Sequence, residues 1–131
     1  MIKYKKTTSL VLVLVILSVS VAPVLANGYS EGYLLGQQAA VEDYNGFGWT
    51  LAGGTGTLLF GLIGGGIVFI GSVATKPGFP PLRLEEIRLH DQDFGAGYRE
   101  GYATKVSNIK TSSTLGGIAI GLIALLTISA R

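Results

Sequence analysis

The residues best suited to chemistry lie in one short stretch two thirds of the way along the chain. His90 is the only histidine, and Asp91 and Asp93 follow it, so the stretch offers one imidazole and two carboxylates. A zinc-type site needs further nitrogen or sulfur ligands, and the chain has no second histidine and no cysteine. The stretch therefore predicts a solvated linker or a helix cap, with Asp91 or Asp93 as the capping residue.

Two further patterns resemble catalytic or binding motifs without completing them. Glu85 and Glu86 are adjacent acids in a charged segment, which favours a solvated helix face over a paired acid and base. The run Gly53-Gly54-Thr55-Gly56 is glycine-rich, but the Lys-Ser or Lys-Thr of a phosphate loop does not follow it. We predict a non-enzymatic protein with no catalytic residues, no cofactor and no metal.

Composition indicates that lipid is the main solvent of this chain. Hydrophobic residues make up 48% of its 131 residues and charged residues 14%, whereas soluble domains carry about 25% charge. The net charge of +2 depends on Lys3, Lys5 and Lys6. Without those three, seven basic residues face eight acidic ones, so the charge gives no argument for nucleic-acid binding.

The chain begins with features of a secretory signal, which we assign to residues 1–26. The three lysines form a positive start, the apolar run 10–17 follows, and Val24 and Ala26 supply the small residues before a cleavage site. The alternative is an uncleaved anchor, because the apolar run is long for a signal peptide. Both interpretations place Asn27 outside the cytoplasm.

Residues 49–75 are predicted to form the first transmembrane helix. This segment has no charged residue, contains eight glycines, and exceeds the ~20 residues that a membrane span needs. Small residues recur every fourth position, which allows close helix packing in lipid. Residues 64–66 are all glycine and would allow a bend near the middle. The predicted packing positions here are Gly53, Thr57, Gly61 and Gly65.

Residues 111–131 are predicted to form a second transmembrane helix. The uncharged window between Lys110 and Arg131 holds 20 residues, just enough to span. Gly117 and Gly121 give this segment a GxxxG packing motif. The alternative is a re-entrant or surface-lying helix. Between the two spans, residues 76–110 form a connector with a proline-rich turn at residues 77–81 and an amphipathic helix from about Phe94.

A six-residue motif occurs twice and indicates an internal repeat. Gly-Tyr-Ser-Glu-Gly-Tyr at residues 28–33 recurs as Gly-Tyr-Arg-Glu-Gly-Tyr at residues 97–102. Each copy begins an amphipathic helix, and each helix leads to an apolar span. The first of these helices is predicted over residues 27–48. The chain is therefore predicted to contain two copies of one unit. The alternatives are coincidence and, for residues 27–48, a loose segment beside the membrane. The repeated residues are Gly28, Tyr29, Glu31, Gly32 and Tyr33, and Gly97, Tyr98, Glu100, Gly101 and Tyr102.

The two repeated glutamates have two interpretations. Glu31 and Glu100 either join helices, with Arg99 or Lys105 of another copy as partners, or are ordinary surface charges.

Charge asymmetry predicts the orientation. Residues 27–50 contain no Lys or Arg, whereas residues 76–110 contain six. The positive-inside rule then places the connector in the cytoplasm and both mature ends outside. The two repeat units would cross in opposite directions, which is an inverted-topology repeat. The predicted fold class is therefore an all-α membrane protein with a signal peptide, two transmembrane helices and an amphipathic Gly/Tyr helix before each.

Three features give the chain a resemblance to known proteins. They are the repeated motif, the segment Pro-Pro-Leu-Arg-Leu at residues 80–84, and the glycine-rich span. The chain resembles a loose group of small uncharacterised bacterial exported or inner-membrane proteins with the same order of parts. The resemblance implies an inner-membrane location and carries no activity with it.

The predicted role is that of a small integral membrane protein held by glycine-face packing. Its predicted partners are the lipid bilayer and either further copies of itself or another membrane protein of an envelope complex. The alternatives are an oligomeric pore or transport accessory component, and a toxin-like membrane peptide.

Overall fold

A computed structural model describes residues 28–130, and all regular structure in that range is helical. The predicted signal peptide and Arg131 lie outside the described residues. An N-terminal helix covers residues 28–43. It is followed by α2 (Phe47–Ala74), α3 (Pro81–Arg88) and α4 (Gln92–Ser129). By length and composition alone, both α2 and α4 are apolar enough to cross a bilayer, so the structure contains the two apolar helices that the sequence predicts.

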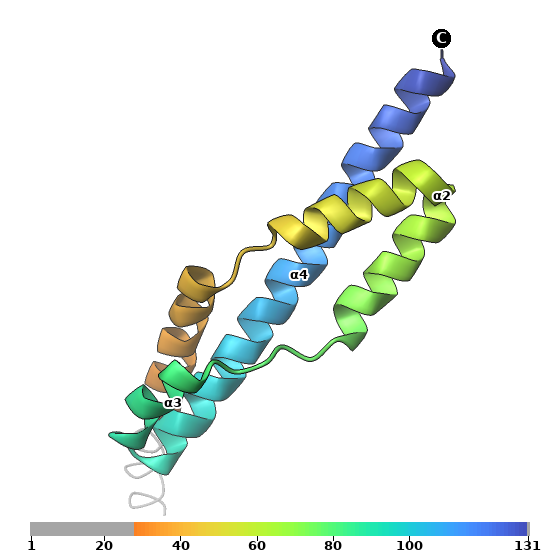
Figure 1. Ribbon diagram of the computed structural model, residues 1–131. Coiled ribbons are helices and arrows are strands. Elements are labelled where there is room, and N and C mark those ends of the chain that lie inside the picture. The colour runs from red at the N-terminus through yellow and green to blue at the C-terminus, as the bar shows by residue number, and fades with distance from the viewer. Residues whose placement is uncertain (1–27, 131) are drawn as a thin grey trace, which may run out of the picture.

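α2 is a hairpin, where the sequence predicted one transmembrane helix over residues 49–75 with a bend possible at residues 64–66. Gly61 has φ 63° and ψ −150°, a non-helical conformation at which the helix reverses. This backbone region is open essentially only to glycine. The two arms pack closely, because a Cβ at Gly64 would overlap the carbonyl oxygen of Gly56. Figure 1 shows the second arm turning back at the far end of α2, toward the side where α3 lies.

α4 is one helix of 38 residues, where the sequence predicted a connector helix followed by a separate span from residue 111. Its start is as predicted, since the Asp91 carboxylate accepts a hydrogen bond of 2.8 Å from the backbone N–H of Phe94. The polar stretch near residue 112 is also helical, and its Ser112 and Thr114 hydroxyls donate hydrogen bonds to carbonyl oxygens one turn earlier.

The structure has two halves that bury different kinds of residue. One half has an apolar core, and the other buries mostly small residues. We call the N-terminal helix, α3 and the first part of α4, up to residue 109, the head. The head has an ordinary apolar core, with Phe79 and Tyr44 packed at its edge. This core comprises Ala39, Ala40, Ile87, Phe94, Tyr98, Tyr102 and Val106.

The other half, which we call the apolar half, consists of the α2 hairpin and α4 from residue 110 onward. Its buried residues are mostly small, and its large apolar side chains point outward. Phe60 is 72% exposed and Ile63 77% exposed. This arrangement suits a structure whose surroundings are lipid. The buried set is Gly53, Thr57, Gly64, Gly65, Ser72, Lys110, Thr114, Gly117 and Gly121.

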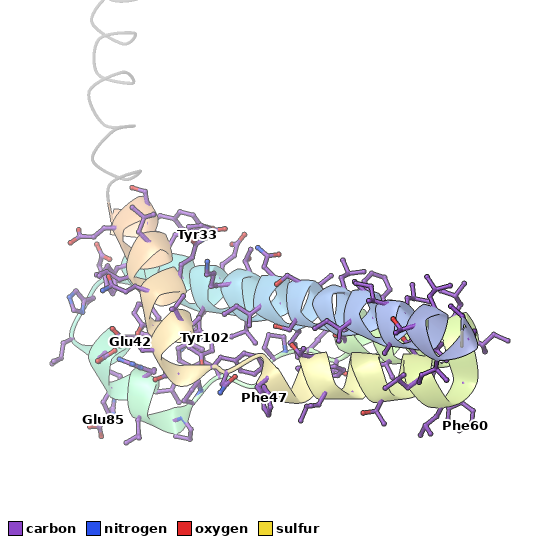
Figure 2. The ribbon with its side chains drawn as sticks, turned by 90° about the horizontal axis from the view of Figure 1, so that it is seen from above. Tyr33, Glu42, Phe47, Phe60, Glu85 and Tyr102 are labelled. Carbon is purple, nitrogen blue, oxygen red and sulfur yellow. The ribbon has the colours of Figure 1, made fainter. Side chains whose placement is uncertain are left out.

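Both ends of the α2 hairpin lie at the same level of α4. The Lys110 ammonium donates a hydrogen bond of 2.6 Å to the carbonyl oxygen of Thr75 and lies 5.4 Å from the centre of the Trp49 ring. A straight crossing would separate Trp49 from Thr75 by the ~30 Å of a bilayer core. Figure 2 shows Phe60 at the end far from the head residues Tyr33 and Tyr102.

Residues 28–43 and most of the connector 76–110, which the predicted orientation separates, belong to one packed head in the structure.

Candidate functional site

The two Gly-Tyr motifs pack directly against each other. A Cβ at Gly97 would overlap the carbonyl oxygen of Tyr29, and one at Gly101 would overlap that of Tyr33. In return, a Cβ at Gly32 would overlap the carbonyl oxygen of Phe94. The motif glycines therefore let two helix backbones touch, which explains why glycine is repeated where it would weaken an isolated helix by ~1 kcal/mol per residue.

The repeat units run parallel, so the inverted-topology prediction is wrong for the described residues. Contacts advance in the same direction along both units, from Tyr29 with Gly97 to Tyr33 with Gly101 in the head. The same direction holds in the apolar half, where Gly53 faces Thr114 and Gly54 faces both Gly117 and Gly121. The first arm of α2 thus pairs with α4 as a parallel neighbour, and the second arm is the return connection.

One repeated glutamate joins the two helices within the chain. The Tyr29 hydroxyl donates a hydrogen bond of 2.5 Å to the Glu100 carboxylate, and this bond raises the pKa of Tyr29. The partner is therefore a tyrosine of the other motif in the same chain, and neither Arg99 nor Lys105. Glu31 is exposed.

Five of the six predicted packing positions are buried in the contact between α2 and α4. A Cβ at Gly53 would lie 2.6 Å from the carbonyl oxygen of Thr114, and one at Gly121 would lie 2.8 Å from Thr57 Cβ. Gly65 and Gly117 are buried in the same contact. The exception is Gly61, which forms the turn and is partly exposed, and a Cβ there would meet no other segment within 4 Å. The glycine face is thus occupied within one chain.

An arginine-centred cluster in the head was not predicted. Arg83 donates two hydrogen bonds of 2.9 Å to the Asp43 carboxylate, one from Nε and one from Nη2. It also contacts Glu42 at 3.3 Å and Glu86 at 3.1 Å. The Tyr98 hydroxyl donates a 2.9 Å hydrogen bond to Glu86. This cluster ties the end of the N-terminal helix to α3 and α4. Asp43 and Arg83 are 40 positions apart in the chain, so no local sequence pattern predicts their contact.

The cluster shifts the titration of its members. Hydrogen bonds from Arg83 lower the pKa of Asp43. Burial, followed by the hydrogen bond to Glu86, raises the pKa of Tyr98 to about 12. The charged carboxylate and the neutral phenol are therefore the forms that the folded head favours.

Acidification is expected to weaken the head. Because the pKa of Asp43 is lower in the folded state, its contribution is present above the unfolded value of about 3.9 and is lost as pH falls through the folded value. The loss is about 1 kcal/mol or less, since the pair is partly exposed. Thermal unfolding of the full chain in detergent between pH 6 and pH 2 measures it. Asp43→Asn is the control and should flatten this part of the profile; an equally steep profile in Asp43→Asn would contradict the assignment.

Lys110 joins both ends of the hairpin to α4. It is 4% exposed, and its ammonium caps the end of α2 at Thr75 while lying near the Trp49 ring. A cation is favourable at a helix C-terminus and over an indole face. The base of the hairpin is therefore fixed where the apolar half begins.

Comparison with protein-family models, curated proteins and solved structures gives no match.

Proposed function

We propose that this chain is a non-enzymatic integral membrane protein in which α4 crosses the bilayer and the α2 hairpin enters it from the head side. The observation that supports the proposal is the distribution of residues in the apolar half. Its buried residues are mostly small, whereas the large apolar side chains of Leu59, Phe60 and Ile63 are exposed. In water this surface would be an aggregation hazard, whereas in lipid it is the expected outer face.

Lengths support one crossing and one re-entrant hairpin. The first arm of α2, from Phe47 to Phe60, is about 21 Å long at 1.5 Å per residue. It is shorter than the ~30 Å bilayer core. α4 from Lys110 to Ser129 measures about 30 Å and is long enough to cross.

The head then lies on one side, and the signal segment places it outside the cytoplasm. The count of basic residues in the connector argues the other way, but that rule applies to loops shorter than about 60 residues. The stretch between the signal and α4 is longer, and residues 28–109 form one packed unit apart from the hairpin. We assign the head to the extracytoplasmic side of an inner membrane and the C-terminal end to the cytoplasm.

Cysteine labelling tests this topology, because the natural chain has no cysteine. Single cysteines replace Gln38, Leu89 and Ala130, all exposed, and intact cells or spheroplasts are treated with a membrane-impermeant maleimide. We expect Gln38→Cys and Leu89→Cys to label from outside and Ala130→Cys only after permeabilisation. Labelling of Gln38→Cys and Leu89→Cys from opposite sides would refute the proposal, and release of the protein by alkaline carbonate would refute membrane integration.

The role that fits this architecture is a subunit of an envelope complex. The glycine face is used within the chain, so partners must meet the head or the lipid-facing surface. The predicted homo-oligomer therefore needs contacts other than the glycine face.

An oligomeric pore or transport component is the second candidate, and the hairpin tip favours it. Non-helical backbone at bilayer depth is tolerated where protein covers it or where it lines a water-filled cavity. Gly61 is such a position and is partly exposed in the single chain. Purified protein in liposomes, tested for ion or solute leak, separates this function from that of a sealed subunit.

A further inference from the structure

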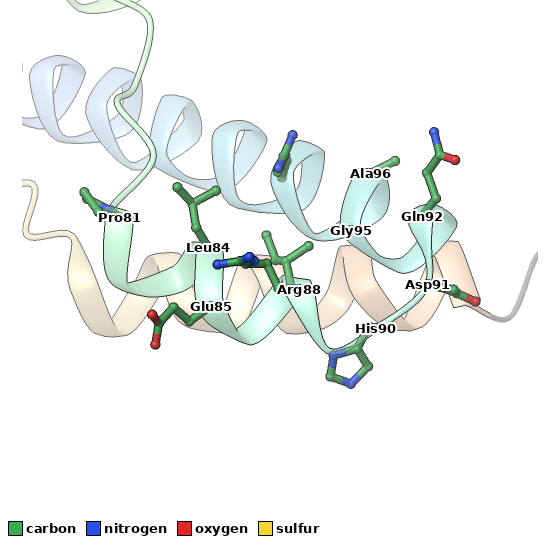
Figure 3. Close-up of a pocket in the computed structure, with 11 residues that line it drawn as sticks. Pro81, Leu84, Glu85, Arg88, His90, Asp91, Gln92, Gly95 and Ala96 are labelled. Carbon is green, nitrogen blue, oxygen red and sulfur yellow. The ribbon is translucent and has the colours of Figure 1, made fainter.

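A groove runs between α3 and the first turns of α4, on the outside of the head. Its volume is about 750 Å³. Both helices line it, and the lining residues that matter most here are Leu84, Ile87 and Arg88 of α3 and Gly95, Ala96 and Arg99 of α4. Figure 3 shows Arg88 on α3 and Gly95 and Ala96 on the facing stretch of α4.

The floor of the groove is apolar because the two helices approach closely. A Cβ at Gly95 would lie 2.6 Å from Cγ2 of Ile87, so glycine is what allows α3 to sit this near to α4. Leu84 and Ala96 extend the floor. Charges beside such a surface are less screened than charges in open water.

Two arginines that line the groove form no charged contact within the head. Arg83 is bound by carboxylates, and Lys110 caps α2. Arg88 and Arg99, by contrast, make no ion pair and no hydrogen bond with any residue in the described range 28–130. A guanidinium presents a planar fork of N–H donors that matches a carboxylate, so both are available to an anionic partner.

The remaining polar groups on the rim are mostly engaged within the chain. The Asp91 carboxylate caps α4, and Nδ1 of His90 lies 2.9 Å from the carbonyl oxygen of Glu86. Glu85, which is exposed, also lines the groove. Its negative charge repels an anionic ligand, so removing that charge should strengthen the binding of such a ligand.

The groove is elongated, which restricts the shape of a ligand. A second cavity of about 400 Å³ shares Leu84 and Arg99 with the first and continues to Phe79 and Tyr102. Along α4 the combined groove extends from Gln92 to Ala103, about 17 Å at 1.5 Å per residue. An extended peptide covers that length with about five residues.

We infer that this groove binds a short acidic segment of a partner protein, with carboxylates on Arg88 and Arg99 and apolar side chains on the floor. This inference rests on the proposed topology, which sets Lys110 at the membrane boundary. Arg99 then lies about 16 Å above that boundary. The lipid headgroup layer is only about 5–8 Å thick on each side, so a partner in solution fits better than a lipid headgroup.

A binding measurement on the purified full chain in detergent tests the inference. The probe is a fluorescent five-residue peptide of alternating Glu and Leu, read by anisotropy, with a Gln-for-Glu peptide as its uncharged match. We expect only the acidic peptide to bind. Arg88→Gln and Arg99→Gln should each weaken binding about fivefold, the factor expected for one partly exposed charge pair. Glu85→Gln should strengthen it about twofold.

Lys105→Gln is the matched control, because it removes the same charge from α4 outside the groove and should change binding less than twofold. Equal binding of the uncharged peptide, or equal losses in Lys105→Gln, would overturn the inference. So would Arg88- and Arg99-dependent capture by anionic phospholipid vesicles without peptide binding. The measurement needs no membrane sidedness, so its failure leaves the labelling pattern of residues 38, 89 and 130 unaffected.

Discussion

Gly117→Ala is expected to destabilise the apolar half by about 2 kcal/mol, the usual cost of overpacking a closely packed contact. A Cβ at Gly117 would overlap the carbonyl oxygen of Thr50 and lie 2.9 Å from the backbone nitrogen of Gly54, so the clash is with backbone and cannot be relieved by a side-chain rotation. The two helices must move apart. Thermal unfolding of the full chain in detergent, followed by circular dichroism, measures the loss.

Gly116→Ala is the control for this experiment, one residue away on the same helix. A Cβ at Gly116 meets no described atom within 4 Å. Alanine there should raise stability by up to ~1 kcal/mol through helix propensity alone. Equal effects of the two substitutions would show that the α2–α4 contact does not depend on the glycine face.

Gly61→Ala is expected to open the α2 hairpin, the largest structural change that a single methyl group should cause in this chain. The φ of 63° and ψ of −150° at Gly61 strain any other residue by about 1–3 kcal/mol. An alanine relieves that strain by becoming helical, which joins the two arms into a continuous helix of up to 28 residues. A fraction of the molecules should then carry the connector across the bilayer.

The position of the connector reports this change. A cysteine in place of Gly78, which is exposed and has open space around its Cα, should lose part of its labelling from the head side when Gly61→Ala is added. Gly66→Ala is the matched control, since Gly66 lies in the second arm with no described neighbour within 4 Å of a Cβ. Unchanged labelling and unchanged thermal stability in Gly61→Ala would show that the hairpin does not depend on this turn.

The apolar segments and the repeat could be predicted from sequence because each depends on local composition. Mean apolarity over residues 49–75 needs no knowledge of the fold, and neither does recognition of Gly-Tyr at residues 28 and 97. The position of the hairpin turn could not be predicted. Eight glycines in one segment offer many places to bend, and the glycine triplet at residues 64–66 was the more obvious one. The actual turn is at Gly61, and it brings Gly64 of the second arm against Gly56 of the first.

The predicted orientation depends on the same turn. Counting Lys and Arg assumes that the chain crosses the membrane between the two counted regions, whereas the reversal at Gly61 brings both regions into one head. The arginine cluster was missed because its strongest contact joins residues 40 apart. No periodic pattern marks such a pair, whereas the cap at Asp91 was predictable because its partner is three residues away.

The parallel pairing of α2 with α4 also sets an order of events during synthesis. Residues 50–57 need the surface made by residues 114–121, which leave the ribosome some 60 residues later, or about 3–12 s at typical rates of translation. Until then the hairpin has no counterpart for its glycines, and the carbonyl oxygen of Thr75 lacks the Lys110 ammonium. The α2 hairpin can therefore pack only after the C-terminal part of α4 has been synthesised. A chain truncated before residue 110 should leave the hairpin unpacked and remain a substrate for membrane quality-control proteases.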